Sequence, residues 1–241
     1  MVEKNKLSIF WFRQDLRLAD NPGLSEAISK GIVLPIYIYD DINSNEYEMG
    51  SASKWWLHNS LEKLNDSLNN KLSVYKGDAL KILESLTKSY DVESISWNRC
   101  YEPWRIKRDK NIKSEIEKKG IEVNTLNGSL LWEPFNILKT DGTPYRVFSP
   151  YYRKGCLNAA PPRIPLKSPE ISSLFKDEYN ELTIEDLSLI PKVHWFDEME
   201  ELWKPGEVGA QEKLYDFLDD GLFGYKEGRN FPSQKNVSQL S

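Results

Sequence analysis

Two arginines flank an aspartate in the segment that leads out of the first strand-like run of the chain. Arg13, Asp15 and Arg17 occupy alternate positions there. A guanidinium presents a rigid fork of N–H donors that fits a carboxylate, so one bidentate pair would fix the loop. We favour a structural clasp over a catalytic role for these three residues.

The residue counts leave little room for metal-dependent or nucleophilic catalysis. Only two histidines are present, His58 and His194, so neither a three-histidine site nor a His-x-x-x-His pair can form. We expect His58 at a helix surface or boundary and His194 packed within a connector. Cys100 and Cys156 cannot build a disulfide framework, and they favour a reduced, cytoplasmic setting. The sequence predicts no metal site and does not support hydrolytic chemistry.

The composition is that of an ordinary folded, water-soluble chain. Its 241 residues are 39% hydrophobic and 29% charged, and no apolar run approaches the roughly 20 residues of a membrane span. We therefore expect no membrane partner. The net charge of −5 is unevenly distributed, because Asp177–Asp220 alone carries −11 and the remainder +6. Since Lys and Arg bind phosphate backbones, any nucleic-acid contact must use residues outside this acidic block.

Strand-like and helix-like runs alternate through the first half of the chain. Strands are expected at 7–12, 32–39, 72–75, 92–97 and 120–123, and helices at 22–30, 53–69, 78–86 and 105–119. This alternation predicts right-handed crossovers and an α/β fold with a doubly wound, Rossmann-like, five-stranded parallel sheet. Pro35 lies within the second strand and lacks an N–H, so we expect a bulge there.

The alternation stops near residue 125. Residues 131–203 are typical of a long interdomain connector with one short helix near 148–157, and a longer helix is expected over Glu207–Gly221 with no second amphipathic helix after it. The apolar stripe of that helix consists of Ala210, Leu214, Phe217 and Leu218. The predicted organisation is an α/β domain at 1–130, the connector, and at 204–241 the first helix of a truncated all-α domain.

No phosphate-binding motif accompanies the predicted sheet. The sequence contains neither a Gly-x4-Gly-Lys-Ser/Thr loop nor a Gly-x-Gly-x-x-Gly turn after the first strand. Ligands of open α/β sheets nevertheless bind beyond the carboxyl ends of the strands. This rule points to the segments 13–20, 40–53, 77–78 and 98–105.

Several motifs, in the same order, resemble those of the DNA photolyase/cryptochrome family. The run Trp11-Phe12-Arg13-Gln14-Asp15-Leu16-Arg17, followed by Asp20-Asn21, is similar to the end of the family's first strand. Further similar segments are Leu34–Ile38, Ser53–Leu61, Tyr101–Asp109, Gly142–Tyr151, Trp203–Ala210 and Tyr225–Ser241. The resemblance covers essentially the whole sequence.

The resemblance implies a role in light-dependent DNA repair. In this family the α/β domain holds or shelters a light-harvesting antenna, and an all-helical domain holds FAD and the lesion pocket. Photoexcited reduced flavin donates an electron to a cyclobutane pyrimidine dimer that is flipped out of the duplex, and the ring splits. The chain is therefore expected to be the N-terminal part of a deoxyribodipyrimidine photolyase, a carbon–carbon lyase whose partner is DNA containing pyrimidine dimers.

Five residues match family positions with known roles. Tyr225 matches a residue that contacts FAD, and Ser238, Leu240 and Ser241 match the segment around the flavin phosphates. Arg229 matches the arginine that contacts a DNA phosphate. No catalytic residue is carried over by the resemblance.

The antenna position departs from that of the folate-binding members of the family. Those members carry an Asn-Glu pair where this chain has Trp104 and Arg105, so the acidic ligand of the folate ring is missing. A folate antenna held in the usual mode is therefore not expected at Trp104 and Arg105. Two roles stay open for Trp104: stacking on another antenna chromophore, or packing between domains. The identity of the chromophore stays open.

The length of the chain sets a further expectation. Family members continue past the position of Ser241 with the rest of the helical domain, which would be the natural packing partner of the apolar stripe. We therefore expect the chain alone to be inactive. Two alternatives stay open: a cryptochrome-type blue-light photoreceptor, and a free-standing module that binds a nucleotide-like ligand or a partner chain without lyase activity.

Overall fold

The computed structural model describes residues 7–44, 47–231 and 233, and these form two compact units. The first unit is drawn from Met1–Glu46 and Lys71–Glu181, and the second from Tyr47–Asn70 and Leu182–Ser241. Helix α2 (Ser51–Ser67) thus belongs to the second unit, although strands of the first unit precede and follow it in the sequence.

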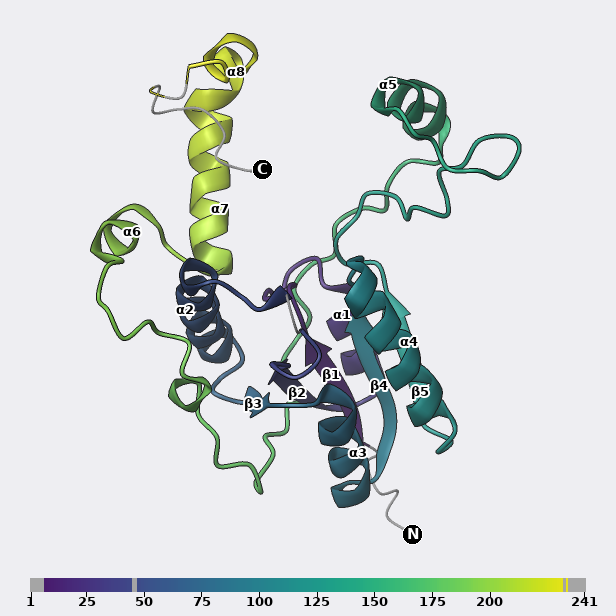
Figure 1. The fold of residues 1–241 in the computed structure, drawn as a ribbon, viewed down its shortest axis with the longest axis vertical. Coiled ribbons are helices and arrows are strands. Elements are labelled where there is room, and N and C mark those ends of the chain that lie inside the picture. Colours follow the sequence, from purple (N-terminus) through teal and green to yellow (C-terminus); the bar gives the residue numbers. More distant parts are fainter. Residues whose placement is uncertain (1–6, 45–46, 232, 234–241) are drawn as a thin grey trace. The chain divides into compact units, whose positions relative to one another are not determined.

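The first unit is built around a five-stranded sheet whose neighbouring strands are all parallel (Figure 1). Its strands are β1 (Leu7–Phe12), β2 (Ile32–Tyr39), β3 (Ser73–Lys76), β4 (Val92–Asn98) and β5 (Glu122–Leu126), in the order β3-β2-β1-β4-β5. The predicted α/β fold with a parallel sheet is confirmed. β1 lies at the centre with every residue buried, which explains its apolar and aromatic sequence.

Pro35 causes no bulge in β2, so that expectation is wrong. The pairing of β1 with β2 continues in register past Phe10 and Pro35. In a strand, the backbone N–H groups of every second residue point toward the same neighbouring strand, so the nitrogens of Val33 and Pro35 point the same way. In that direction Val33 exchanges backbone hydrogen bonds with Ser173 and Phe175. The pairing of β2 with β3 begins only after Pro35. The missing N–H of Pro35 therefore falls between these two pairings and interrupts neither.

Three helices of the first unit connect its strands. They are α1 (Pro22–Ser29), α3 (Ala79–Ser89) and α4 (Pro103–Glu117). Two of them have side-chain caps: Asn21 Oδ1 accepts a hydrogen bond from the Leu24 N–H at 3.1 Å, and Asp78 Oδ1 accepts one from the Lys81 N–H at 3.0 Å. Such caps satisfy N–H groups of the first turn, so these helices begin where the sequence indicates.

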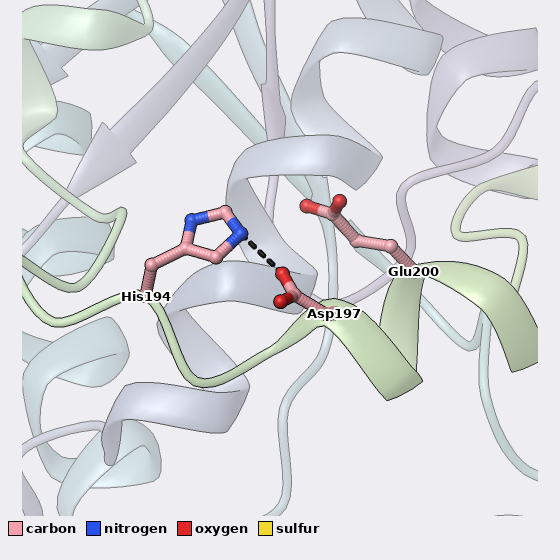
Figure 2. A group of neighbouring side chains, drawn as sticks. All are labelled: His194, Asp197 and Glu200. Atoms are coloured by element: carbon pink, nitrogen blue, oxygen red, sulfur yellow. Dashed lines mark ion pairs between the residues drawn. The ribbon is translucent and has the colours of Figure 1, made fainter.

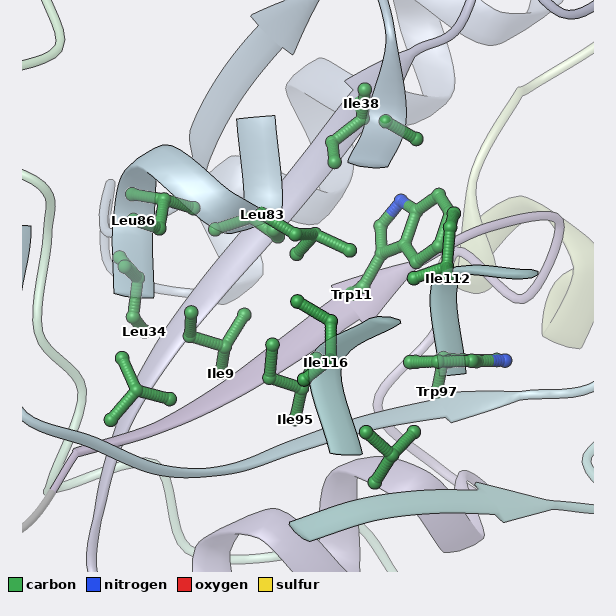
Figure 3. Packing of buried hydrophobic residues seen from close by; sticks show 14 of the residues in the cluster. Ile9, Trp11, Leu34, Ile38, Leu83, Leu86, Ile95, Trp97, Ile112 and Ile116 are labelled. Carbon is green, nitrogen blue, oxygen red and sulfur yellow. The ribbon is translucent and has the colours of Figure 1, made fainter. Parts of the chain in front are cut away.

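A hydrophobic core lies on one face of the sheet, between the strands and the helices α3 and α4 (Figure 3). Trp11 of β1 and Trp97 of β4 meet edge to face there, with ring centroids 5.6 Å apart. Ile112 and Ile116, one turn apart on α4, are fully buried in the same cluster. This packing fixes α4, and with it the residues of its first turn.

The connector folds onto the first unit after residue 170. The carboxylate of buried Asp177 accepts hydrogen bonds from the hydroxyls of Tyr75 and Tyr90, both at 2.5 Å, and its N–H donates to Ser73 Oγ at 3.0 Å. Earlier in the connector, α5 (Phe148–Pro150) and the helical turns Tyr151–Gly155 and Cys156–Asn158 form one helical stretch. This confirms the short helix predicted near 148–157.

The described part of the second unit is helical. It contains α2, α6 (Asp197–Leu202), α7 (Glu207–Asp216) and α8 (Leu222–Gly228), and π-helical residues Phe217–Gly221 join α7 to α8. The sequence indicates no second amphipathic helix after Gly221, and the short helix α8 found there continues the path of α7. Helix α6 lies where the sequence indicates only a connector. Its acidic first turn suits the positive end of the helix dipole.

Aromatic pairs hold the second unit together. Trp55 of α2 lies 6.1 Å from Phe196, and Trp56 lies 5.8 Å from Trp203 between ring centroids. The predicted apolar stripe runs from Ala210 on α7 into the π-helical residues after it. It is largely exposed, with Leu214 41% and Leu218 46% accessible. Among the helices that the structure describes, none has the length and apolar character needed to cross a membrane.

Candidate functional site

The carboxyl ends of β1, β2 and β4 lead into the segments that the sequence singles out. β1 is followed by Arg13, β2 by Asp40, and β4 by the residues that open α4. Because all three strands are parallel neighbours or next neighbours, their carboxyl ends lie at one edge of the sheet. The polar side chains at this edge form two groups, a clasp and an arginine–tryptophan cluster.

The clasp joins the loop after β1 to the end of β4. The Nδ2 group of buried Asn98 donates hydrogen bonds to Asp15 Oδ2 and, at 2.7 Å, to Asn21 Oδ1, while its Oδ1 accepts from the Gly23 N–H at 3.0 Å. Asp15 Oδ1 also accepts the backbone N–H of Arg13 at 2.9 Å. A buried carboxylate is stabilised by these donors, and the loop is fixed in place.

The clasp has different partners from those expected, because Asp15 forms no side-chain pair with either arginine in the described structure. Arg13 Nη2 instead contacts Asp109 Oδ2 at 2.8 Å. Arg17 donates to backbone carbonyl oxygens, at 2.7 Å to Asp20 and at 2.6 Å to Gly128. The two arginines thus fix the loop, as expected, but they do so through Asp109 and Gly128, which lie about 90 to 110 positions away in the sequence.

The arginine–tryptophan cluster consists of Trp11, Arg13, Trp104, Arg105 and Arg108. The guanidinium carbons of Arg13 and Arg108 lie 4.1 Å and 5.0 Å from the ring centroid of buried Trp11. Arg105 and Arg108 in turn lie 4.9 Å and 5.0 Å from the ring centroid of Trp104. Such cation–π contacts strengthen when they are removed from water. Both tryptophans therefore contribute to holding the arginines.

Acidic residues neutralise part of this cluster. Arg108 Nη1 lies 3.0 Å from Asp40 Oδ2, and Arg108 Nη2 lies 3.0 Å from Asp109 Oδ1. Arg105 Nη1 lies 3.6 Å from Cys100 Sγ, and its Nε is 3.5 Å from Glu102. The Arg13 Nη1 and Trp11 Nε1 groups are buried without a hydrogen-bond partner among the described residues. Buried unpaired donors are rare in folded proteins, and they mark a place where an acceptor fits.

Burial and charge set the protonation behaviour at this edge. Burial alone would lower the pKa of the Arg13 guanidinium, but the Asp109 carboxylate beside it outweighs this effect and raises that pKa. Burial and the neighbouring positive charge of Arg13 lower the pKa of Arg108. Burial also raises the pKa of the nearby Tyr37 hydroxyl. An arginine stays protonated in a protein, so the cluster keeps its cations.

Glu133 anchors the loop that follows β5, and no pattern in the sequence indicates this role. It is 5% exposed, pairs with the guanidinium of Arg99, and accepts a hydrogen bond from the Tyr101 hydroxyl at 2.9 Å. Burial and the hydrogen bond to Glu133 raise the pKa of Tyr101 to about 12. The residues flanking Trp104 on the β4 side are thereby tied to the connector.

The flavin and DNA positions suggested by the sequence lie in the second unit. Tyr225 of α8 is half-buried, contacts Phe217 with ring centroids 5.5 Å apart, and has the Arg229 guanidinium 5.9 Å above its ring. Arg229 is exposed. The structure thus brings Tyr225 and Arg229 together. Ser238, Leu240 and Ser241 lie outside the described residues.

A group of ionisable side chains marks the start of α6 (Figure 2). The nearest ligand atoms of His194, Asp197 and Glu200 lie within 4.8 Å of one another. His194 pairs with Asp197, and Glu200 Oε1 accepts a hydrogen bond from Trp55 Nε1 at 3.3 Å. His194 is exposed, with only its ring against Phe196, so the expectation of a packed residue is wrong. These exposed groups already have protein partners and indicate no metal site by themselves.

Comparison with known proteins identifies the family. Residues 8–170 match the family model for DNA photolyase. The chain belongs to the DNA photolyase family. Over 238 residues it is 37% identical to the deoxyribodipyrimidine photo-lyase of Agrobacterium fabrum, an alignment that covers 97% of this chain and 49% of that photolyase. Cryptochrome-2 of Arabidopsis thaliana is 27% identical, over 100% of this chain and 40% of the cryptochrome.

Solved photolyase structures show the same fold. The crystal structure of a bacterial class III photolyase from Agrobacterium tumefaciens matches with a TM-score of 0.91 and 35% identity, over 100% of this chain and 50% of that one. An archaeal photolyase from Sulfolobus tokodaii, solved with two FAD molecules and associated with a novel light-harvesting cofactor, matches with a TM-score of 0.65 and 27% identity, over 88% of this chain and 46% of that one. The chain spans about half the length of these photolyases.

The arginine–tryptophan cluster places hydrogen-bond donors and an indole face at the edge of the sheet where ligands of open α/β folds bind. Buried Arg13 and Trp11 offer unpaired N–H donors, and half-buried Trp104 offers part of an indole face. Cys100, Asp40 and Glu102 contribute the remaining polar atoms nearby. Of the four positions that match FAD contacts in the family, Tyr225 is the one that lies among the described residues.

Proposed function

We propose that the chain forms the N-terminal half of a deoxyribodipyrimidine photolyase, an FAD-dependent enzyme that uses blue light to split cyclobutane pyrimidine dimers in DNA. One observation carries the proposal: 37% identity along 97% of the chain to a photolyase, joined to a TM-score of 0.91 with a class III photolyase. The alignment includes both units, so the likeness is not limited to a common sheet architecture.

The first unit would hold the antenna at the arginine–tryptophan cluster. Trp104 provides a flat surface for a planar ring, and Arg105 is available for a negative group beside it. Asp40 and Asp109 hold Arg108 and Arg13 in place, so the site is preorganised before binding. A chromophore bound there would supply light absorption, and these residues would fix its position.

The second unit would begin the flavin-binding part. Tyr225 and Arg229 lie together on the surface, so the tyrosine ring is available to the flavin side and the guanidinium to a DNA phosphate. Contacts of the second kind position a duplex without reading its sequence. The exposed apolar residues Leu214 and Leu218 would pack against the helices that a photolyase carries in its second half.

A chimera tests this proposal directly. Residues 1–241 are fused to the second half of the Agrobacterium fabrum photolyase, and loss of dimers from an ultraviolet-irradiated oligonucleotide is followed under blue light and in darkness. We expect the chimera to retain FAD and to repair dimers only in the light, whereas the 241-residue chain with added FAD repairs none. Light-driven repair with stoichiometric FAD in the chain alone would refute the assignment as one half of the enzyme.

A cryptochrome-type photoreceptor is the second candidate, because likeness to Cryptochrome-2 extends along the whole chain. Its lower identity, 27% against 37%, places it second. A chimera that binds FAD and is bleached by light, yet leaves dimers intact, would favour this function over repair.

A further inference from the structure

The helical stretch Phe148–Asn158 presents side chains that neither the antenna nor the flavin proposal uses. On its exposed side, and just before it, lie Arg146, Phe148, Tyr152, Arg153 and Lys154, which we name the aromatic–basic face. Phe148 is 73% exposed and Tyr152 45%. Isolated apolar residues on a surface are common, but two aromatic rings set among three cations form a surface of defined chemistry.

The aromatic–basic face rests on a small folded base. Tyr145 and Tyr151 meet edge to face with centroids 6.2 Å apart, and Cys156 and Ile137 are 4% and 3% exposed. Gly155 allows the close approach, since a Cβ there would lie 2.5 Å from Ile137 Cγ2. The stretch therefore has its own inner side, and the outward position of Phe148 and Tyr152 is not a consequence of unfolding.

The charges on this face are available to a ligand. No hydrogen bond or ion pair occupies the side chains of Arg146, Arg153 or Lys154 within the described structure, and all three residues are exposed. Residues 139–167 contain six basic residues and one acidic residue, Asp141. This segment is thus strongly positive in a chain whose net charge is −5. It also lies outside the acidic block, as a nucleic-acid contact requires.

The two exposed rings are arranged for stacking. Phe148 and Tyr152 lie four residues apart on the same helical face, with ring planes 6° apart and centroids 5.9 Å apart. Because the rings already face one another, a planar ligand would stack on the outer face of Phe148. Arg153 and Lys154 follow directly in the sequence, and both are exposed.

We propose that the aromatic–basic face binds single-stranded nucleic acid. Cations that track phosphates, combined with aromatic rings on which bases stack, are the recurring elements of such sites. A single strand is the partner because its bases expose their faces, whereas those of a duplex are covered by their neighbours. Phosphate contacts carry no sequence information and every base has a face that can stack, so binding is expected to be independent of sequence.

Fluorescence anisotropy of a labelled dodecathymidylate tests the proposal with the 241-residue chain, in darkness and without added flavin. We expect saturable binding at low salt, with log affinity falling against log salt at a slope of about −2, since three cations would contact phosphates. The substitution Phe148→Ala should weaken binding about tenfold or more, as should the pair Arg153→Glu and Lys154→Glu.

Matched controls separate this surface from general charge. Phe223→Ala removes a ring that is 96% exposed elsewhere, and the pair Lys107→Glu and Lys110→Glu makes the same charge change on the exposed side of α4. Both controls should leave the affinity within about twofold. Three results would each overturn the proposal: no binding at low salt, an equal loss of affinity in the Lys107 and Lys110 control pair, or an unchanged affinity in Phe148→Ala.

Two competitors decide the class of ligand. A dodecamer duplex should compete more weakly than the single strand, and heparin should compete with wild type and Phe148→Ala alike. Equal competition by duplex and single strand would contradict stacking on unpaired bases. Since the DNA is undamaged and no light or flavin is used, failure here is distinguishable from failure of dimer repair by the chimera.

Discussion

Arg108 Nη1 lies 3.0 Å from Asp40 Oδ2, and only 9% and 3% of these two side chains are exposed. This pair joins the second turn of α4 to the carboxyl end of β2. Through Asp109 the same network continues to Arg13 after β1. Three segments that meet at one edge of the sheet are thus linked by buried charges.

Removing one partner of this pair should destabilise the first unit strongly. We expect Asp40→Ala to lower the free energy of unfolding by about 3 kcal/mol, because it leaves the Arg108 guanidinium buried with a single carboxylate partner. Urea unfolding followed by circular dichroism measures this. Glu115→Ala, which breaks the exposed pair with Lys118, is the control and should cost less than about 0.5 kcal/mol. Similar losses in the two variants would contradict the importance of burial.

The clasp should be as sensitive. Asn98→Ala leaves Asp15, Asn21 and the Gly23 N–H without their shared partner, so we expect a loss of about 3 kcal/mol or more in urea unfolding. Asn136→Ala, an exposed asparagine, should change the stability by no more than about 0.5 kcal/mol. A tolerated Asn98→Ala would mean that water replaces the amide.

Gly128 should tolerate no side chain. A Cβ at this position would lie 2.5 Å from Asn98 Cγ, inside the clasp, so Gly128→Ala is expected to lower the melting temperature by several degrees. Gly224→Ala in α8 meets nothing within 4 Å and should be neutral or slightly stabilising. Thermal melts of both variants provide the measurement, and equal melting temperatures would be the contrary result.

The Tyr101–Glu133 hydrogen bond predicts a pH dependence. The pKa of Tyr101 is raised to about 12 in the folded chain from about 10, so its contribution to stability is complete below about pH 10 and is lost as the pH rises through about 12. The stability difference between wild type and Tyr101→Phe should therefore be constant from pH 8 to 10 and then shrink. Tyr179→Phe, at a residue 78% exposed, controls for loss of a hydroxyl.

Trp104 should govern binding of a planar anion at the proposed antenna site. With FMN as the probe, we expect quenching of flavin fluorescence by the chain and an affinity about tenfold lower in Trp104→Ala, because the stacking surface is lost. Trp195→Ala removes an indole that is 45% exposed elsewhere and should have no effect. Equal affinities of wild type and Trp104→Ala would place the chromophore away from the cluster.

The sequence indicates where the site lies better than it indicates which atoms meet there. Strand alternation predicts the sheet, and parallel strands then bring Arg13, Asp40 and the start of α4 to one edge. The main side-chain partner of Asp15 escaped prediction, because Asn98 approaches it through tertiary packing and no local spacing encodes such a contact. Glu133 is missed for the same reason. It lies in a connector without periodicity.

Short helices and Pro35 show a second limit of sequence patterns. Helix α6 is too brief for its apolar period to be recognised, and α8 follows π-helical residues that shift the period of α7. The bulge expected at Pro35 assumed a complete ladder on both sides of β2. In the fold, the edge of β2 that faces away from β1 is shared by two partners: Ser173–Phe175 pairs with its first part and β3 with its second part. The first of these pairings joins residues more than a hundred positions apart, which no local pattern indicates.

The interleaving of the two units has a consequence for synthesis on the ribosome. Helix α2 leaves the exit tunnel early, but the remainder of its unit begins only at Leu182, 112 residues after Asn70. During that interval α2 carries exposed tryptophan and leucine side chains on a nascent chain, while the strands of the first unit are still being added. The first unit is complete once Glu181 has been synthesised, whereas α2 must wait for the residues after Leu182 before it can pack within its own unit.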